Sequence, residues 1–123
     1  MARILIVDDD AQMRNMLQLM LERLGHETTQ ASDGREGVAA HQDAPFELVI
    51  TDILMPGGEG LETIQDLRRV HPEVKIIAIS GGGRTGALDF LDVAEKLGAH
   101  RTLQKPFGLD DLTQAVETLL SPG

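Results

Sequence analysis

Four short apolar runs in this chain each end in a residue with a carboxylate, a hydroxyl or an amine. The endings are Asp8–Asp10, Asp52, Ser80 and Lys105. Adjacent carboxylates suit a divalent cation, because Mg²⁺ prefers oxygen ligands and retains several waters. A carboxylate can also act as a nucleophile and form an aspartyl phosphate. A hydroxyl and an ammonium could then bind the phosphoryl oxygens. The four endings, if the fold brings them together, suit phosphoryl transfer assisted by a metal ion.

Each of these residues also has a simpler interpretation when it is taken alone. The run Asp8–Asp10 could be a capping and loop cluster, since aspartate is common at helix N-caps and in turns. Asp52 and Ser80 could be turn residues, and Lys105 could be an exposed charge. Chance would have to place a suitable group at all four endings. Their joint occurrence therefore favours a single site.

The elements that must position these residues alternate between short β-rich runs and segments of helical periodicity, which predicts a parallel α/β sheet. The expected strands cover residues 3–7, 27–31, 46–51, 74–79 and 101–104. The expected helices run from about 11 to 25, 34 to 42, just after 60 to just before 72, 88 to 97 and 109 to 120. Ligands bind outside the carboxyl ends of the strands in such a sheet, so the four endings should share one edge.

The composition describes an ordinary globular chain. We expect residues 1–123 to form one domain, with 121–123 as a frayed tail. The chain has no cysteine, no evident signal peptide and no apolar run that could span a membrane, which fits a cytoplasmic protein. Its net charge of −9 argues against direct binding to nucleic acid or to an anionic membrane.

The remaining residues that could do chemistry have weaker patterns. Gly81, Gly82 and Gly83 follow Ser80 and predict either a plain turn or a flexible functional loop, and the sequence leaves both open. The four histidines are scattered, so we interpret them as surface or loop residues instead of metal ligands. The helical spacing of Met13, Met16 and Met20 predicts packing.

Taken together, the motifs resemble the receiver domains of two-component response regulators along the whole chain. The stretches that carry this resemblance are Ile6–Asp10, Leu48–Pro56, Ile77–Ser80 and Leu103–Phe107. The combination is highly specific, although no single motif is. The resemblance implies a flavodoxin-like, doubly wound sheet of five parallel strands in the order 2-1-3-4-5, with five helices.

The resemblance also implies a role for each candidate residue. Asp52 corresponds to the phosphoacceptor. Asp8 and Asp9 correspond to the acidic pair that binds Mg²⁺ or Mn²⁺, together with Asp52 and the backbone carbonyl of Leu54. Ser80 matches the switch hydroxyl. Lys105 matches the family's lysine, and the bond from this lysine to the following proline is usually cis.

By the same resemblance, the protein accepts a phosphoryl group from a histidine kinase or a histidine phosphotransfer protein. It then changes the face formed by helix four, strand five and helix five, acts on an unidentified downstream protein, and loses the group by hydrolysis. It catalyses only its own phosphorylation and dephosphorylation. The chain ends soon after the fifth expected helix, so it resembles a stand-alone receiver of the chemotaxis-regulator kind.

Two departures from the family pattern keep an alternative open. Thr102 occupies a switch position that is usually aromatic, and the segment after Ser80 is longer than is typical. A pseudo-receiver that acts only as an interaction module is therefore an alternative. An aspartyl-phosphate phosphatase of the haloacid-dehalogenase kind is less favoured, because Leu54 stands where those enzymes carry a second aspartate. A flavin protein is disfavoured because Asp8–Asp10 would repel the flavin phosphate.

Overall fold

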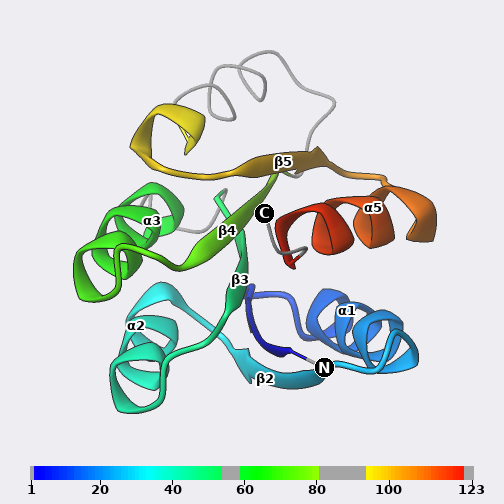
Figure 1. Ribbon diagram of the computed structural model, residues 1–123, viewed down its shortest axis with the longest axis horizontal. Helices are drawn as coiled ribbons and strands as arrows, with labels where there is room; N and C mark the ends of the chain where they lie inside the picture. Colours follow the sequence, from blue (N-terminus) through cyan, green and yellow to red (C-terminus); the bar gives the residue numbers. More distant parts are fainter. Residues whose placement is uncertain (1, 54–58, 81–93, 121–123) are drawn as a thin grey trace.

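The computed structural model describes residues 2–53, 59–80 and 94–120, and these form one parallel sheet flanked by helices (Figure 1). The strand order is β2-β1-β3-β4-β5. The strands are β1 (Arg3–Val7), β2 (Glu27–Ala31), β3 (Leu48–Asp52), β4 (Lys75–Ser80) and β5 (Arg101–Gln104). The helices are α1 (Ala11–Arg23), α2 (Gly34–Asp43), α3 (Glu59–Val70) and α5 (Leu109–Leu120). The expected flavodoxin-like fold is confirmed. Most of the expected helix 88–97 lies outside the described residues. The part that is described, 94–97, is helical.

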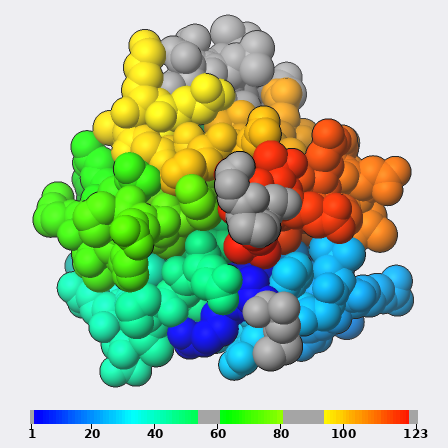
Figure 2. Space-filling view, in the orientation of Figure 1, coloured from blue at the N-terminus to red at the C-terminus, as the bar shows by residue number. Residues whose placement is uncertain are grey.

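Two apolar cores lie on opposite faces of the sheet, because successive side chains of a strand point to opposite sides. Leu5, Val49 and Ile76 pack with α2 and α3 on one face. Ile6 and Ile50 pack with α1 and α5 on the other. The central strands are therefore buried on both sides, which explains their continuous apolar sequence. On the face that Figure 2 shows, β1, in dark blue, is visible in a small area between its neighbours.

The boundaries of β3 and β4 differ from the expected ones. β3 begins at Leu48 instead of residue 46 and ends at Asp52, and β4 covers 75–80 instead of 74–79. The parallel ladder continues further than the apolar pattern does, since Asp52 pairs with Ile79 and Ser80 pairs with Gln104. Asp52 and Ser80 are therefore the last residues of β3 and β4, and the sheet holds their backbones in place.

Met16, which was expected to pack, is exposed, and so is the apolar Leu109. Met16 is 41% exposed and Leu109 is 45% exposed. In α1 the buried face is centred on Leu17 and Leu21, with Met13 and Met20 packed at its border, so Met16 points away from the sheet. Leu109 is the first residue of α5 and precedes the stripe that faces the sheet.

The interpretation of the histidines was wrong for His41, which is fully buried within α2. Its Nδ1 accepts a hydrogen bond from the Phe46 N–H at 3.1 Å. Nδ1 atoms of His26 and His100 accept in the same way from the N–H groups of Ala2 and Ile76. These N–H groups lie close to where strands begin, and a side-chain acceptor satisfies them. The spacing of His41 from the buried Gly34 and Gly37 on α2 is the sequence signal that could have revealed its burial.

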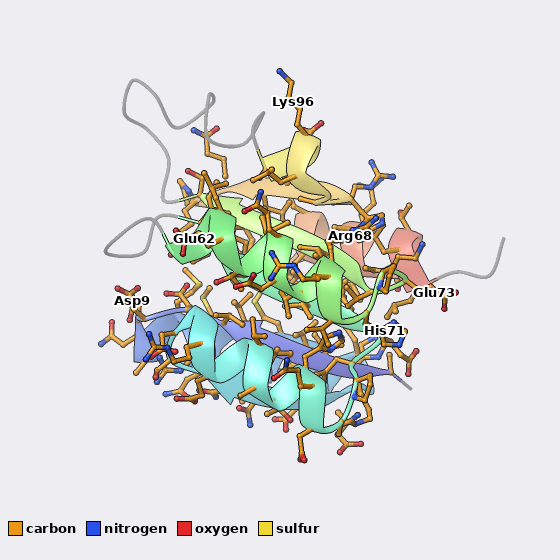
Figure 3. All side chains as sticks on the ribbon, turned by 90° about the vertical axis from the view of Figure 1, so that its left-hand side faces the viewer. Asp9, Glu62, Arg68, His71, Glu73 and Lys96 are labelled. Atoms are coloured by element: carbon orange, nitrogen blue, oxygen red, sulfur yellow. The ribbon has the colours of Figure 1, made fainter. Side chains whose placement is uncertain are left out.

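The strands all begin at one end of the molecule and finish at the other. Figure 3 shows Asp9 at one end and His71 with Glu73 at the other. The end with Asp9 is the carboxyl edge of the sheet, and the opposite end carries the strand starts. Within the described ranges, no helix combines the length and the apolar character needed to cross a bilayer.

Candidate functional site

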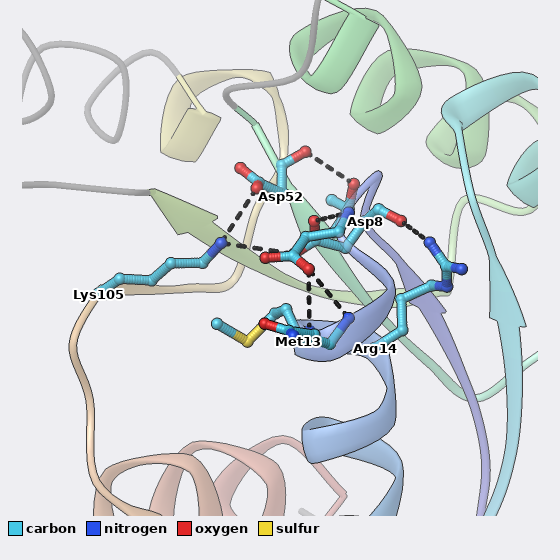
Figure 4. A network of polar contacts seen from close by, with 8 residues as sticks. Asp8, Met13, Arg14, Asp52 and Lys105 are labelled. Atoms are coloured by element: carbon cyan, nitrogen blue, oxygen red, sulfur yellow. Dashed lines mark hydrogen bonds and ion pairs between the residues drawn. The ribbon is translucent and has the colours of Figure 1, made fainter.

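The carboxyl edge of the sheet brings together the residues that the sequence placed at the strand ends. Carboxylate oxygens of Asp8, Asp9 and Asp52 all lie within 4.8 Å of one another. The Nζ atom of Lys105 is 3.2 Å from Asp52 Oδ2 and 3.5 Å from Asp8 Oδ2 (Figure 4). These residues come from the ends of β1, β3 and β5, and the order of the strands in the sheet is what makes them neighbours.

The acidic run after β1 divides into three environments. Asp8 is buried, and its Oδ1 accepts a hydrogen bond from the Asp10 N–H at 2.9 Å. Asp9 is exposed at the rim of the cluster. Asp10 is the N-cap of α1, and its side chain accepts from the N–H groups of Gln12 and Met13. The capping interpretation therefore holds for Asp10, while Asp8 and Asp9 belong to the cluster.

Burial and neighbouring charges set the electrostatics of the cluster. Burial raises the pKa of Asp8, and the Asp52 carboxylate raises it further, whereas the Asp10 N–H and Lys105 act in the opposite direction. Burial alone would lower the pKa of Lys105, but the Asp52 and Asp8 carboxylates outweigh it and raise that pKa. Lys105 is therefore a fixed positive charge at neutral pH. Three carboxylates against one ammonium leave a negative excess at this edge.

The donor set fits a hard divalent cation. All three side chains offer carboxylate oxygens, which are the ligands that Mg²⁺ and Mn²⁺ prefer. Asp8 and Asp52 are held at strand ends, and the exposed position of Asp9 leaves room for waters that Mg²⁺ keeps. Leu54, whose carbonyl was expected to be a further ligand, lies outside the described residues, as do Gly81, Gly82 and Gly83.

Ser80 ends β4 with a fully buried side chain. Its hydroxyl makes no hydrogen bond within the described part of the chain. Its carbonyl accepts a hydrogen bond from the Lys105 N–H at 2.8 Å, which ties the end of β4 to the residue after β5. The expected cis bond between Lys105 and Pro106 is present. A buried hydroxyl that has no partner among the described residues is costly, so Ser80 has a donor to offer to a new acceptor.

Thr102 lies in β5 and is half-buried. It lines a hollow of about 260 Å³ between β5 and α5, together with Arg101, Leu103 and residues of α5. An aromatic residue would bring a much larger side chain to this position. The small threonine borders this hollow without filling it.

Two residues near the cluster were missed by the sequence analysis. Arg14 Nη1 donates to the backbone carbonyl of Asp8 at 2.7 Å, and Arg14 Nε donates to Gln30 Oε1 at 3.0 Å. An arginine one turn into the helix that follows the acidic run was the available signal for Arg14. No local pattern marked Gln30, because its partner lies sixteen positions away.

Comparison with known proteins agrees with the geometry. The family described as "Response regulator receiver domain" matches residues 4–117. The chain is 33% identical over 120 residues to the response regulator receiver protein CpdR of Brucella abortus, covering 98% of both chains. It is 34% identical to the chemotaxis protein CheY of Thermotoga maritima, covering 93% of both. The solved receiver domain of NtrX from Brucella abortus superposes with a TM-score of 0.89 at 33% identity, over 98% of this chain and 99% of that one.

Several other relatives are longer proteins. The chain spans between 24% and 52% of the length of three regulators that it matches at 34% identity. The similarity is therefore to the receiver part of those proteins.

Proposed function

The chain belongs to the response regulator receiver domains of two-component signalling, and from this premise we propose that it is a switch controlled by phosphorylation of Asp52. The observation that carries the proposal is the surroundings of the Asp52 carboxylate. It sits at the end of the buried strand β3, beside the Asp8 and Asp9 carboxylates and 3.2 Å from Lys105 Nζ.

The transfer that we propose forms one bond and breaks one. A carboxylate oxygen of Asp52 attacks the phosphorus of a phosphohistidine on a histidine kinase or a histidine phosphotransfer protein. The P–O bond forms as the P–N bond breaks, and the imidazole leaves as the neutral base because its other ring nitrogen is protonated. Hydrolysis later returns Asp52 to a carboxylate and releases phosphate. No other substrate is turned over.

The residues around Asp52 supply charge and position for this transfer. A Mg²⁺ or Mn²⁺ ion bound by Asp8, Asp9 and Asp52, with the Leu54 carbonyl as a further ligand, would neutralise the charge of the phosphoryl group. Lys105 already contacts Asp52 and offers an ammonium to the phosphoryl oxygens. Ser80 offers its buried hydroxyl from the end of the neighbouring strand β4.

The signal leaves the site through the two strand ends that Ser80 and Lys105 occupy. The hydrogen bond from the Lys105 N–H to the Ser80 carbonyl couples them, so drawing either side chain toward a phosphoryl group displaces both. We propose a population shift at the face of helix four, β5 and α5, where the hollow beside Thr102 lets β5 adjust. We propose that this protein acts on a downstream protein in the cytoplasm and itself makes no direct contact with nucleic acid or membrane.

Intact-mass analysis after incubation with acetyl phosphate and Mg²⁺ tests the proposal. The parent chain should gain one phosphoryl group, and Asp52→Ala should gain none. Asp43→Ala, which removes an exposed carboxylate at the end of α2, is the matched control and should label like the parent. Ser80→Ala should still be labelled. Phosphate on Ser80 or on a histidine would show that the mechanism is wrong, and no labelling at all would favour the pseudo-receiver that the Thr102 substitution suggests.

A further inference from the structure

Arg14 links three elements at the back of the acidic cluster. It belongs to α1 and is half-buried. Its guanidinium reaches the Asp8 carbonyl at the end of β1 through Nη1, at 2.7 Å, and the Gln30 side chain on β2 through Nε, at 3.0 Å. Figure 4 shows Arg14 extending toward Asp8 from the side of the cluster away from Lys105.

The Gln30 side chain is held in one orientation by its remaining contacts. Its Nε2 donates to Asn15 Oδ1 at 3.1 Å and to Gln18 Oε1. With both donors directed to α1, the amide oxygen is left to accept from Arg14. Gln30 therefore fixes the position of the guanidinium, which a flexible arginine would not keep by itself.

The Asp8 carbonyl belongs to the peptide group that joins Asp8 to Asp9. The Asp8 N–H donates to the Ala31 carbonyl at 3.2 Å, and the Asp8 carboxylate accepts from the Asp10 N–H. These two bonds hold the peptide groups on either side of the Asp8–Asp9 peptide, and the contact from Arg14 to the Asp8 carbonyl fixes the peptide between them. The plane of this peptide determines where the exposed Asp9 side chain leaves the backbone.

Arg14 has two opposite effects on a cation at the cluster. Its positive charge repels the cation, whereas its hydrogen bonds preset the backbone that carries two of the three carboxylates. If charge were the only effect, removal of Arg14 would strengthen cation binding. Loss of a group that orients metal ligands typically weakens metal affinity by about 10- to 100-fold, so we expect the positioning effect of Arg14 to outweigh its repulsion of the cation.

We propose that Arg14 and Gln30 form a positioning pair that presets the Asp8–Asp9 backbone for binding of Mg²⁺. The pair thereby sets the Mg²⁺ concentration at which Asp52 is phosphorylated. This inference rests on the proposed function. Within the described residues, neither Arg14 nor Gln30 forms a hydrogen bond to a carboxylate of the cluster, so they act through the Asp8 backbone.

Two variants separate the positioning effect from the charge effect. Gln30→Met leaves every charge in place and frees the guanidinium. Arg14→Lys keeps the charge but loses the planar fork that reaches Asp8 and Gln30 together. Arg23→Met is the control, because it removes an exposed arginine from the far end of the same helix. Should Arg14→Lys fold poorly, Gln30→Met still tests the proposal.

The experiment measures Mg²⁺ binding by calorimetry and the initial rate of labelling by acetyl phosphate as a function of Mg²⁺ concentration. Gln30→Met and Arg14→Lys should each raise the dissociation constant and the half-saturating Mg²⁺ concentration about 10-fold or more. Their rates at saturating Mg²⁺ should equal the rate of the parent, and Arg23→Met should match the parent throughout.

Either of two results would overturn the inference. One is a parent-like half-saturating Mg²⁺ concentration in both variants, with only a lower melting temperature, which would mean that the pair stabilises the fold alone. The other is a lower rate at saturating Mg²⁺ with unchanged Mg²⁺ affinity. A parent chain that binds no Mg²⁺ and is not labelled would instead overturn the proposed function, and the inference with it.

Discussion

Acidification should destabilise this protein through His41. The ring is fully buried in α2, and its Nδ1 accepts the Phe46 N–H at 3.1 Å, so the neutral ring carries its proton on Nε2. A second proton would have to go on Nδ1, where it would break this hydrogen bond and place a charge in the core. Burial lowers the pKa of His41, and the neighbouring His71 lowers it further.

The direction of the pH effect on stability follows from proton binding to the folded and unfolded states. Unfolded His41 takes up a proton near its ordinary pKa of about 6.5, while the folded protein does so only at lower pH. The unfolded state therefore binds more protons, and the contribution of His41 is fully present above that value and is lost as the pH falls toward the folded pKa. Asp8, whose pKa is raised, acts in the opposite direction at lower pH.

The contribution of His41 to the pH dependence of stability is limited to the uptake of one proton. The free energy of unfolding should fall by up to about 1.4 kcal/mol for each pH unit below the unfolded pKa. A chain of 123 residues unfolds with an entropy of about 0.26 kcal/mol/K, so the melting temperature should fall by about 5 °C per pH unit. Burial also lowers the pKa of His100, with Lys75 and Arg68 nearby, and this adds in the same direction.

Urea unfolding followed by circular dichroism, between about pH 7.5 and about pH 5.5, measures this slope. His41→Asn keeps an acceptor for the Phe46 N–H but cannot be protonated. It should lower stability at every pH, because the ring is lost, and it should flatten the slope. His26→Asn, a histidine with a similar contact to the Ala2 N–H, controls for loss of an imidazole at a strand start. Parallel pH profiles for the parent and His41→Asn would refute the reasoning.

Three further predictions concern the cluster and its supporting packing. Mg²⁺ at ten times its dissociation constant should stabilise the parent by about 1.4 kcal/mol, measured by calorimetric melting. Asp9→Asn should remove most of this stabilisation. Sodium chloride at matched ionic strength is the control for screening of charges. Asp8→Asn should raise the free energy of unfolding without Mg²⁺ at neutral pH, since burial and Asp52 disfavour the ionised form of Asp8; a lower value in urea titrations would contradict this. Gly37→Ala should destabilise by about 1 to 3 kcal/mol, because its Cβ would lie 2.8 Å from Val7 Cγ2; a variant as stable as the parent in the same titrations would show that β1 and α2 separate easily.

The architecture and the identity of the central site could be predicted from local patterns. Short apolar runs alternating with amphipathic segments define a parallel α/β sheet, and such a sheet brings its carboxyl ends to one edge. That rule, together with the strand order that the family resemblance implies, places Asp52 near Asp8 and Lys105, although 53 and 97 positions separate Lys105 from Asp52 and Asp8. A capping role for the run Asp8–Asp10 was one interpretation on the same local grounds, and Asp10 takes that role.

The tertiary structure decided which atoms meet and which faces are covered. Met16 is exposed although its spacing matches that of buried neighbours, because the sheet contacts only the side of α1 that carries Leu17 and Leu21. The burial of His41 depends on its packing against Phe46 and His71. The contact of Arg14 with Gln30 requires α1 to lie along β2. Periodicity reports that a side chain is buried or exposed on average, whereas a hydrogen-bond partner is chosen by the packing of whole elements against one another.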